Sequence, residues 1–180
     1  STGFAVDGGI LTDDPAVAQA LADACWTLAQ NENLPTVELR GGMLPAIGWT
    51  VKSDSYLGFS KPLEADDEKQ MLSIPKRHRA ELRKGLDNGL DIEVGRDARF
   101  LDIHYRLYAE NVHRLGTPVL PKSLFRSVLE TFRQDADIMI VSKDGVPHTS
   151  IFSLYYNGAC MPYWHGATLH ARGLHSNEVA

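Results

Sequence analysis

The sequence predicts an α+β fold in which helices pack against a mixed sheet. From residue 90 onward the hydrophobic pattern switches between the periods of a strand and of a helix, in the order β-α-α-β-β-β. Two tight-turn signals, Asp144-Gly145 and Asn157-Gly158, separate the last three strands. These strands are therefore expected to be sequential and antiparallel. The first third of the chain has a different order, αβββ.

The first third is predicted to hold one helix and three short strands. Asp13 or Asp14 followed by Pro15 indicates a helix start, and apolar residues at helical spacing continue until Asn31 and Asn33. Gly41-Gly42 then interrupts the extended pattern. The expected strands are 36–40, 47–52 and 56–59.

A polar and acidic segment, residues 62–70, is the best candidate for a domain boundary. We therefore expect two parts, 1–72 and 73–180. They either remain separate or complete each other as one compact, permuted sheet. Because the chain lacks an initiator methionine and stops where a capped helix begins near Ser176, we expect an internal piece of a longer protein.

A basic helix that leads into a strand is the most distinctive stretch of the chain, at residues 74–94. Ser73 is expected to cap this helix and Pro75 to occupy its first turn. Gly85 and Asn88-Gly89 are expected to end it. The following strand begins at Leu90, where apolar and acidic residues alternate as in a half-buried strand.

The basic helix is predicted to have one packed side and one cationic side. His78, Leu82 and Leu86 form the expected packed stripe. Since the net charge of the chain is -5, the cations of this helix are a local concentration on an acidic background. Clustered arginines suit a phosphate or another polyanion, and a merely solvated face is the alternative. The cations are Lys76, Arg77, Arg79, Arg83 and Lys84.

The remaining elements follow from period and from helix stop signals. A long helix is expected from Asp97 to Leu115, where Gly116 and Pro118 end it, and a second helix from Pro121. The last three strands are expected at 137–142, 146–156 and 159–166.

Composition limits the function classes. With 180 residues, 43% hydrophobic and 23% charged, the chain has an ordinary globular composition. No run approaches the eighteen apolar residues of a membrane span, and no secretion signal precedes the first helix, so a cytoplasmic location is expected. A pI near 5.8 argues against general coating of nucleic acid but allows one local anion site.

Several motifs narrow the fold further. They are the basic run 76–85, Leu115-Gly116-Thr117-Pro118-Val119, and the pairs Tyr155-Tyr156 and Pro162-Tyr163. Together with the element order, they resemble the GNAT acyltransferase fold. Within that fold they are similar to FemAB-related proteins associated with exosortase (PEP-CTERM) systems, members of the Fem family of peptidyl and aminoacyl transferases. On this resemblance, 1–72 is the later part of a first GNAT-like lobe and 73–180 the early part of a second.

The resemblance implies transfer of an acyl or aminoacyl group to an amine. The family's typical acceptors are cell-envelope precursors, and its typical donor is charged tRNA. GNAT enzymes that use acetyl-CoA carry a Gln/Arg-x-x-Gly-x-Gly/Ala loop after the fourth strand, whose amides hold the pyrophosphate. Residues 168–177 fit that pattern poorly, because Gly173 is their only glycine. Aminoacyl-tRNA or another acyl donor is therefore favoured over acetyl-CoA, and no permanently bound cofactor is expected.

The predicted substrate site is the cleft between the fourth and fifth strands of a GNAT-like sheet. Aromatic residues lie on two adjacent strands, and alternation sends some of them to the core and the others to this cleft. The turn after the long helix is either a plain cap or a second wall of the channel. The residues expected to contact substrate, besides the five cations, are Arg114, Thr117, Tyr156, Tyr163 and Trp164.

Residue type alone makes His165 and Glu110 the candidates for the base that takes the proton of the amine, and the catalytic residue stays open. Because nucleophile-elbow, Walker and dinucleotide motifs are absent from the sequence, direct attack of the amine on the donor carbonyl is preferred to a covalent mechanism. His165, His170 and His175 recur every five residues, a spacing that does not favour a metal site.

Three functions remain open at this point. The first is a Fem-like N-acyltransferase that acts on a phosphate-bearing precursor or small molecule, with tRNA as a candidate donor. The second is a non-catalytic GNAT-like module that binds phosphate-bearing ligands through the basic helix. The third is an ordinary acetyl-CoA-dependent N-acetyltransferase.

Overall fold

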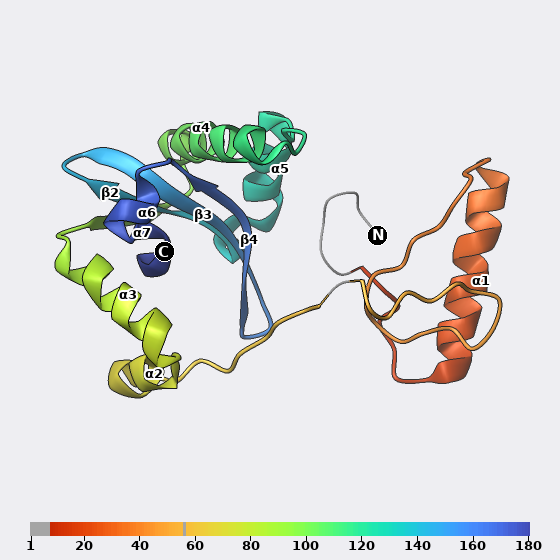
Figure 1. Cartoon of the computed structure of the whole chain (residues 1–180). Coiled ribbons are helices and arrows are strands. Elements are labelled where there is room, and N and C mark those ends of the chain that lie inside the picture. Colours follow the sequence, from red (N-terminus) through yellow and green to blue (C-terminus); the bar gives the residue numbers. More distant parts are fainter. Residues whose placement is uncertain (1–7, 56) are drawn as a thin grey trace. The chain divides into compact units, whose positions relative to one another are not determined.

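The computed structural model describes residues 8–55 and 57–180. The chain divides into two units, Ser1–Lys61 and Pro62–Ala180. Figure 1 labels the elements of both units. Within the described residues, no helix combines the length and the apolar character that crossing a membrane requires.

The first unit is built on the helix α1 (Pro15–Asn31), which begins and ends as predicted. The Asp14 side chain accepts a hydrogen bond from the Ala16 N–H at 2.8 Å, and Pro15 occupies the first turn. The buried positions of α1 are alanines, and Ile10 completes a small core with two of them. The larger apolar side chains of the helix, Val17, Leu21 and Leu28, are exposed.

The three strands predicted for the first unit are wrong within the described residues. Residues 36–40, 47–52 and 57–59 form no strand, and Tyr56 lies outside the described residues. The ladder contact described for this unit is an isolated parallel bridge between Ile10 and Gly42. A strand requires a partner along its length, and most residues from 41 to 59 are exposed rather than paired. The sequence of these segments favours an extended backbone, but within the described residues no neighbouring strand supplies the hydrogen bonds that would make them strands.

The second unit confirms the predicted order β-α-α-β-β-β. Its four strands form one sheet in the order β1-β2-β3-β4, and all neighbouring pairs are antiparallel. The elements are α2 (Asp67–Ser73), α3 (Lys76–Asp87), β1 (Asp91–Gly95), α4 (Ala98–Leu115), α5 (Lys122–Phe132), the 3-10 turn η1 (Arg133–Asp135), β2 (Ala136–Lys143), β3 (Val146–Tyr156), β4 (Ala159–Ala167), α6 (Ala171–Leu174) and α7 (Ser176–Val179).

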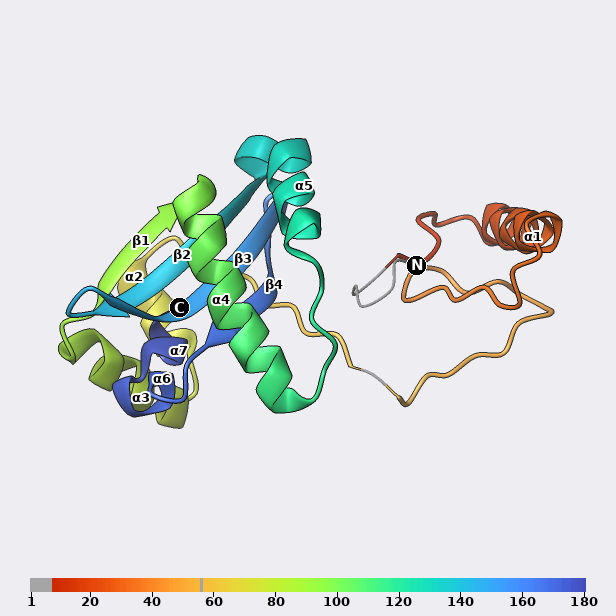
Figure 2. The same cartoon turned by 90° about the horizontal axis from the view of Figure 1, so that it is seen from above.

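Helices lie on both faces of this sheet. Figure 2 shows α4 crossing one face, with α5 beside it. Phe125 of α5 packs there against Phe152 of β3 and Trp164 of β4, with ring centroids 6.0 and 5.1 Å away. The helices α6 and α7 lie on the opposite face, where the hydroxyls of Thr149 and Ser176 are 2.7 Å apart. The main core therefore lies between the sheet and α4/α5.

The first strand, β1, is more exposed than its alternating pattern predicted. Ile92 and Val94 lie opposite Val141 and Met139, on the face away from α4, and are 48% and 55% exposed. Glu93 points to the other face and pairs with Arg99 of α4 at 2.5 Å. Since β1 is an edge strand, the expectation that it is half-buried is wrong for its apolar side.

The basic helix forms, but two of its expected boundary residues have other roles. Ser73 is the last residue of α2 instead of the cap of α3, and the cap position is Pro75, which makes no side-chain cap hydrogen bond. Gly85 lies inside the helix and is buried. A Cβ at this position would lie 2.5 Å from Cγ2 of Val179, so the glycine permits close contact with α7.

This contact also turns the packed side of α3 away from the predicted stripe. His78 and Leu86 are exposed, and Leu82 is half-buried. The buried side is centred on Gly85 because α7 approaches there. Of the three residues predicted to form the packed stripe of α3, Leu82 is therefore the one that is partly buried.

A second glycine brings α4 against β4. A Cβ on Gly166 would lie 2.5 Å from the backbone nitrogen of Tyr108. The helix starts at the Asp97 cap and ends at Gly116, whose φ of 72° is left-handed, as the sequence predicted. The C-terminal half of α4 therefore runs along β4, and this contact places the candidate site.

Candidate functional site at the outer edge of β4

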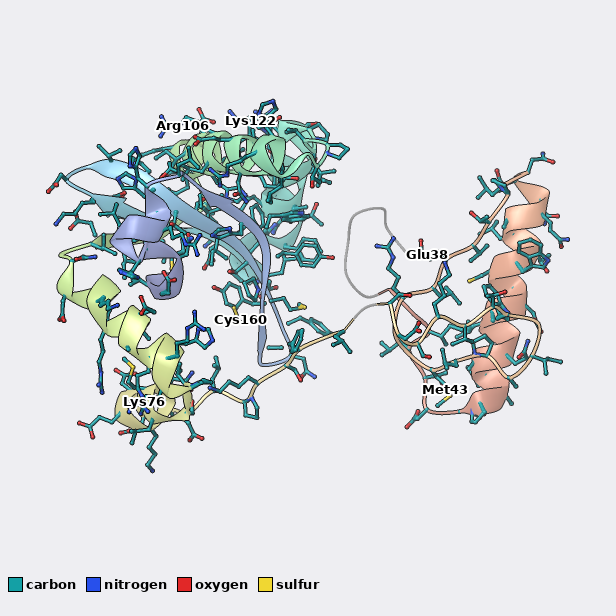
Figure 3. All side chains as sticks on the ribbon, in the orientation of Figure 1. Glu38, Met43, Lys76, Arg106, Lys122 and Cys160 are labelled. Atoms are coloured by element: carbon teal, nitrogen blue, oxygen red, sulfur yellow. The ribbon has the colours of Figure 1, made fainter. Side chains whose placement is uncertain are left out.

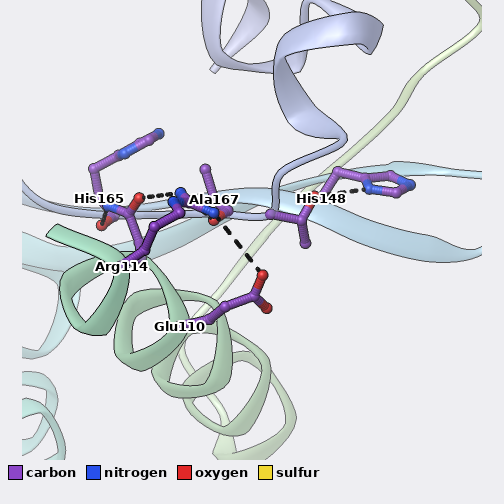
Figure 4. Close-up of polar contacts among 7 residues, drawn as sticks. Glu110, Arg114, His148, His165 and Ala167 are labelled. Atoms are coloured by element: carbon purple, nitrogen blue, oxygen red, sulfur yellow. Dashed lines mark hydrogen bonds and ion pairs between the residues drawn. The ribbon is translucent and has the colours of Figure 1, made fainter.

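The candidate site lies along the outer edge of β4, between the C-terminal half of α4 and the start of α7. Within the described residues β4 pairs with β3 on one side and with no fifth strand on the other. The predicted cleft between strands four and five is thus represented by this edge. Figure 4 shows the side chains that meet there.

Two side chains of α4 hold the backbone of β4. Asn111 Nδ2 donates to the carbonyl oxygen of His165 at 3.4 Å, and Arg114 Nη2 donates to that of Ala167 at 3.2 Å. Arg114 also donates to Asn111 Oδ1 at 2.6 Å, which joins the two contacts. The position of β4 relative to α4 is therefore fixed by polar contacts as well as by Gly166.

The hydrogen-bonding pattern of the antiparallel pair β3–β4 leaves the backbone N–H groups of two β4 residues facing outward, away from β3. The N–H of Thr168 donates to the carbonyl of His148 at 2.9 Å, so residues 148 and 168 form a hydrogen-bonded pair of the antiparallel ladder. His165 and Ala167 then occupy the other type of position, in which N–H and C=O point away from β3. Their carbonyls are bound by α4, and their N–H groups point to the same outer side.

A β-bulge lies next to these residues. Phe152 pairs with Trp164, whereas Ser153 pairs with Pro162, so Tyr163 is an extra residue on β4. Its ring lies 4.6 Å from that of Trp164. Bulges bend a strand and redirect its side chains, and they are frequent beside active sites.

His165 is a titratable residue that itself carries one of the two outward amides. It lies opposite Ile151, so its side chain is on the face away from α4, and it is exposed. Its Nε2 is 3.3 Å from Asn177 Oδ1. Partial desolvation by the surrounding protein lowers the pKa of His165, the charge of Arg114 lowers it further, and the hydrogen bond to Asn177 acts in the opposite direction. The ring is therefore neutral at neutral pH and able to accept a proton.

Glu110, the other candidate base, lies on α4. Its carboxylate is 4.0 Å from Nη1 of Arg114. Figure 4 shows Glu110 and the ring of His165 on opposite sides of β4, with Arg114 between them. The structure thus brings both candidates to one edge, but only His165 shares a face with α7.

The other predicted substrate contacts divide into two groups. Arg114 and Tyr163 belong to this edge. Trp164 instead packs in the core, 5.3 Å from Phe152. Tyr156 is 78% exposed and lies at the β3–β4 turn, beside a hollow of about 340 Å³. Thr117 follows the left-handed Gly116, and its N–H donates to the carbonyl of Val112 at 2.9 Å, which is a plain helix cap.

The cationic side of α3 is mostly exposed, as predicted. Arg79 is half-buried and the other four cations are exposed, and Figure 3 shows Lys76 at the start of the helix. Among the described residues, the ion pair found for these five is that of Lys84 with Glu81, at 3.0 Å. Lys84 and, more weakly, His175 hold the pKa of Glu81 below its usual value.

Two contacts tie α3 to the loop before α7. His175 Nδ1 lies 3.1 Å from the Glu81 carboxylate, and Asn88 Nδ2 donates to the carbonyl of Leu174 at 2.8 Å. This loop continues into Asn177, which contacts His165. The basic helix and the edge of β4 are therefore connected through the same short segment.

The three regularly spaced histidines point in different directions. His165 faces Asn177, and His175 faces Glu81. The ring of His170 lies 6.4 Å from that of His148, beside a hollow of about 450 Å³ that Lys143 also lines. In the described part of the chain, no three histidine, cysteine or acidic side chains gather as metal ligands would.

Residues 73–180 match the family model described as an acetyltransferase (GNAT) domain. The chain belongs to this family. The matched residues contain the sheet, the bulge and the edge site, and membership supports N-acyltransferase activity in general. No curated protein matches the chain.

Sequence reasoning missed the partners of His165. Asn177, Thr149 and Ser176 form a hydrogen-bonded group behind its ring. The contact of Asn111 with β4 was not predicted either. The motifs gave no signal for the contact of Asn177, because twelve residues separate it from His165 and only the turn through α6 brings them together.

Proposed function

We propose that this GNAT domain transfers an acyl or aminoacyl group to an amine at the outer edge of β4. The observation that carries the proposal is the pair of outward N–H groups, on His165 and Ala167, beside a neutral imidazole. Alternate N–H groups along a strand lie about 6.6 Å apart. One of the two therefore donates to a given carbonyl oxygen and stabilises the negative charge that develops there under attack. The neighbouring base accepts the proton that the amine loses.

The proposed step is direct. The amine nitrogen attacks the carbonyl carbon of the donor ester, a C–N bond forms, and the C–O bond to the leaving group breaks with its electron pair. The amine gives up one proton to His165, and the leaving oxygen takes up one proton. Much of the rate enhancement then comes from holding amine and ester together at the edge, because orientation replaces a bimolecular encounter.

For the donor we favour aminoacyl-tRNA or another acyl donor over acetyl-CoA. The support is the loop after β4, where Gly173 is the single glycine between Thr168 and Ala180 and α6 has four residues. A pyrophosphate cradle needs several amides in a glycine-shaped turn at a helix start. The cations of α3 would hold phosphates of the tRNA end or of the acceptor precursor.

The acceptor in this proposal is an amine of a cell-envelope or polysaccharide-linked precursor, modified in the cytoplasm. Its basis is the resemblance of the basic run 76–85 and the motif 115–119 to FemAB-related proteins of exosortase systems. On the same basis, residues 1–72 are the later part of a first lobe and 73–180 the early part of a second.

The test is acyl transfer by the protein in its full natural length. Charged tRNA and acetyl-CoA are offered separately with amine acceptors that carry phosphate, and a mass increase on the amine is measured. We expect transfer from charged tRNA and its loss in His165→Gln, whereas His170→Gln, which changes a ring facing His148, retains it. Transfer from acetyl-CoA alone would favour an ordinary acetyltransferase. Phosphate binding without transfer from either donor would favour a binding module that uses the exposed cations of α3.

A further inference from the structure

A hydrogen-bonded chain of side chains lies behind His165. Thr149 Oγ1 donates to Asn177 Oδ1 at 2.9 Å, and the Ser176 hydroxyl lies 2.7 Å from the same Thr149 oxygen. Thr149 and Ser176 are fully buried, so their hydrogen bonds must be satisfied inside the protein. His165 meets this chain at its exposed end, 3.3 Å from Asn177 Oδ1.

The donors of this chain follow once Asn177 Oδ1 is taken as the acceptor that Thr149 and His165 share. An amide oxygen only accepts, and Thr149 has a single proton, which it gives to Asn177. The Ser176 hydroxyl has one proton and faces two acceptors, the Thr149 oxygen at 2.7 Å and the Ala171 carbonyl at 3.3 Å, and we assign the proton to the nearer Thr149 oxygen. Because Asn177 Oδ1 also faces Nε2 of His165, that nitrogen must carry its proton. Nδ1 is then the imidazole nitrogen with the free lone pair.

We propose that Asn177 and Thr149 are positioning residues for His165, which hold its ring in the Nε2–H form and leave Nδ1 as the atom that accepts the proton of the amine. The role in transfer rests on the function proposed above, whereas the tautomer itself does not. Neither residue touches a substrate in this proposal. They act through the orientation of His165, and the buried Ser176 fixes the direction in which Thr149 donates.

Three groups set the electrostatic environment of this ring. Arg114 on α4 opposes its positive charge, and the Asn177 oxygen on α7 favours that charge. His104, buried on the other side of the sheet, also interacts with it. Replacing Asn177 with a carboxylate therefore changes the most direct favourable contact and leaves Arg114 and His104 in place.

The first measurement is nitrogen NMR of the imidazole rings in the full chain. The chain has seven histidines, and the signal lost in His165→Gln assigns this one. We expect the Nε2–H form for His165 at neutral pH and an increased share of the Nδ1–H form in Thr149→Val, which frees the Asn177 amide to turn. An Nδ1–H ring in the unchanged protein would overturn the proposal.

Thr168→Val is the matched control. The Thr168 hydroxyl lies 3.1 Å from Nδ1 of His148, so Thr168 contacts a different histidine. Thr149 reaches His165 through Asn177. We expect Thr168→Val to change the His148 signals and spare those of His165, and Thr149→Val to do the reverse. If Thr149→Val disturbs both rings equally, its effect is general unfolding of the sheet and the positioning role is refuted.

The second measurement is the pKa of His165 in two variants of Asn177. Asn177→Asp places a carboxylate against Nε2 and should raise the pKa by about one unit or more. Asn177→Leu removes the acceptor and should lower it. An unchanged pKa in Asn177→Asp would contradict the proposal, because a carboxylate in the position assigned to Oδ1 cannot leave the ring unaffected.

The final measurement joins this inference to the reaction. With the donor that supports transfer, the acid limb of the pH profile of kcat/KM should move upward in Asn177→Asp by the same amount as the pKa measured by NMR. A shifted pKa with an unshifted acid limb would refute the link between Asn177 and proton transfer. Absence of transfer with every donor would refute the proposed function, while the NMR results would still decide the tautomer.

Discussion

Acid should destabilise the second unit through one buried residue, His104 of α4. Its side chain is fully buried, and Nδ1 lies 2.9 Å from the hydroxyl of Ser150. The ring lies among Tyr108, Phe125 and Phe152, at centroid distances of 5.5 to 6.0 Å. Nε2 has no hydrogen-bond partner among the described residues. A protonated ring would therefore be a buried charge without a counter-ion.

The size of the effect follows from the pKa. Burial, with a smaller contribution from His165, lowers the pKa of His104 from 6.5 to about 3. The unfolded chain binds this proton below pH 6.5, but the folded chain does not until about pH 3. Stability is therefore complete above pH 6.5 and falls as the pH drops toward 3. At about 1.4 kcal/mol per pH unit, the loss is about 2 kcal/mol at pH 5, a large part of a typical domain stability of about 5–15 kcal/mol.

Urea unfolding of the full chain at pH 7 and pH 5 measures this loss. Trp164 packs between Phe125 and Phe152, and Trp26→Phe with Trp49→Phe leaves it as the single fluorescent tryptophan. The comparison variant, His104→Leu/Ser150→Ala, replaces both hydrogen-bond partners with apolar groups, a change that is often close to neutral.

We expect the difference in unfolding free energy between parent and variant to change by about 2 kcal/mol from pH 7 to pH 5. His104→Gln provides the same comparison if the double variant does not fold. Parallel pH curves for parent and variant would refute the argument, because the remaining histidines are common to both.

Three further predictions concern the other surfaces of this unit. The double variant Lys76→Glu/Arg83→Glu should bind a polyanion such as heparin more weakly than the parent. Its Tm should change little, since exposed charges contribute about 0–1 kcal/mol per pair. Unfolding of the variant would instead show that these cations belong to a structural ion-pair network. Gly85→Ala should lower the Tm by several degrees, because the added Cβ would lie 2.5 Å from Val179. Gly173→Ala is the control and should leave the Tm unchanged, because a Cβ there would have no atom within 4 Å. Equal Tm values for the two variants would show that α7 can shift away from residue 85 without loss of stability. Calorimetry at low salt should detect no acetyl-CoA binding to the full-length protein, and micromolar affinity that is lost on changing Gly173 to a bulky residue would restore the ordinary acetyltransferase.

The sequence was sufficient to predict the order of helices and strands in the second unit because the helix-stop and turn signals are local. The stop at Gly116 and the turns at Asp144-Gly145 and Asn157-Gly158 adopt left-handed backbone conformations that their residue types favour. The strands of the first unit were predicted wrongly from the same kind of extended pattern. A strand also depends on a partner elsewhere in the chain, and a pattern in 36–59 contains no information about whether one is present.

The site was predicted by residue type and assembled by distant contacts. His165 and Arg114 were chosen as candidates because imidazole and guanidinium groups suit proton transfer and anion binding, and the structure places both at the edge of β4. Trp164 was expected in the cleft, but it lies opposite Phe152 and packs against Phe125, because regular alternation from Ala167 to Trp164 sends it to the face opposite that of His165. Thr149 and Asn177, 28 residues apart, meet only after the strand and helix have folded.

The loop after β4 departs from the GNAT pattern because it has one glycine, Gly173, where a pyrophosphate loop has several. Where a pyrophosphate loop would need glycines, this chain has residues whose own atoms make specific contacts. His175 pairs with Glu81, the Leu174 carbonyl accepts from Asn88, and Asn177 accepts from Thr149. Additional glycines in place of His175 and Asn177 would remove the contact with Glu81 and the acceptor for His165. In this chain the loop therefore contacts His165 and anchors the cationic helix α3. Under the proposed function, the donor phosphates would be held by the cations of α3.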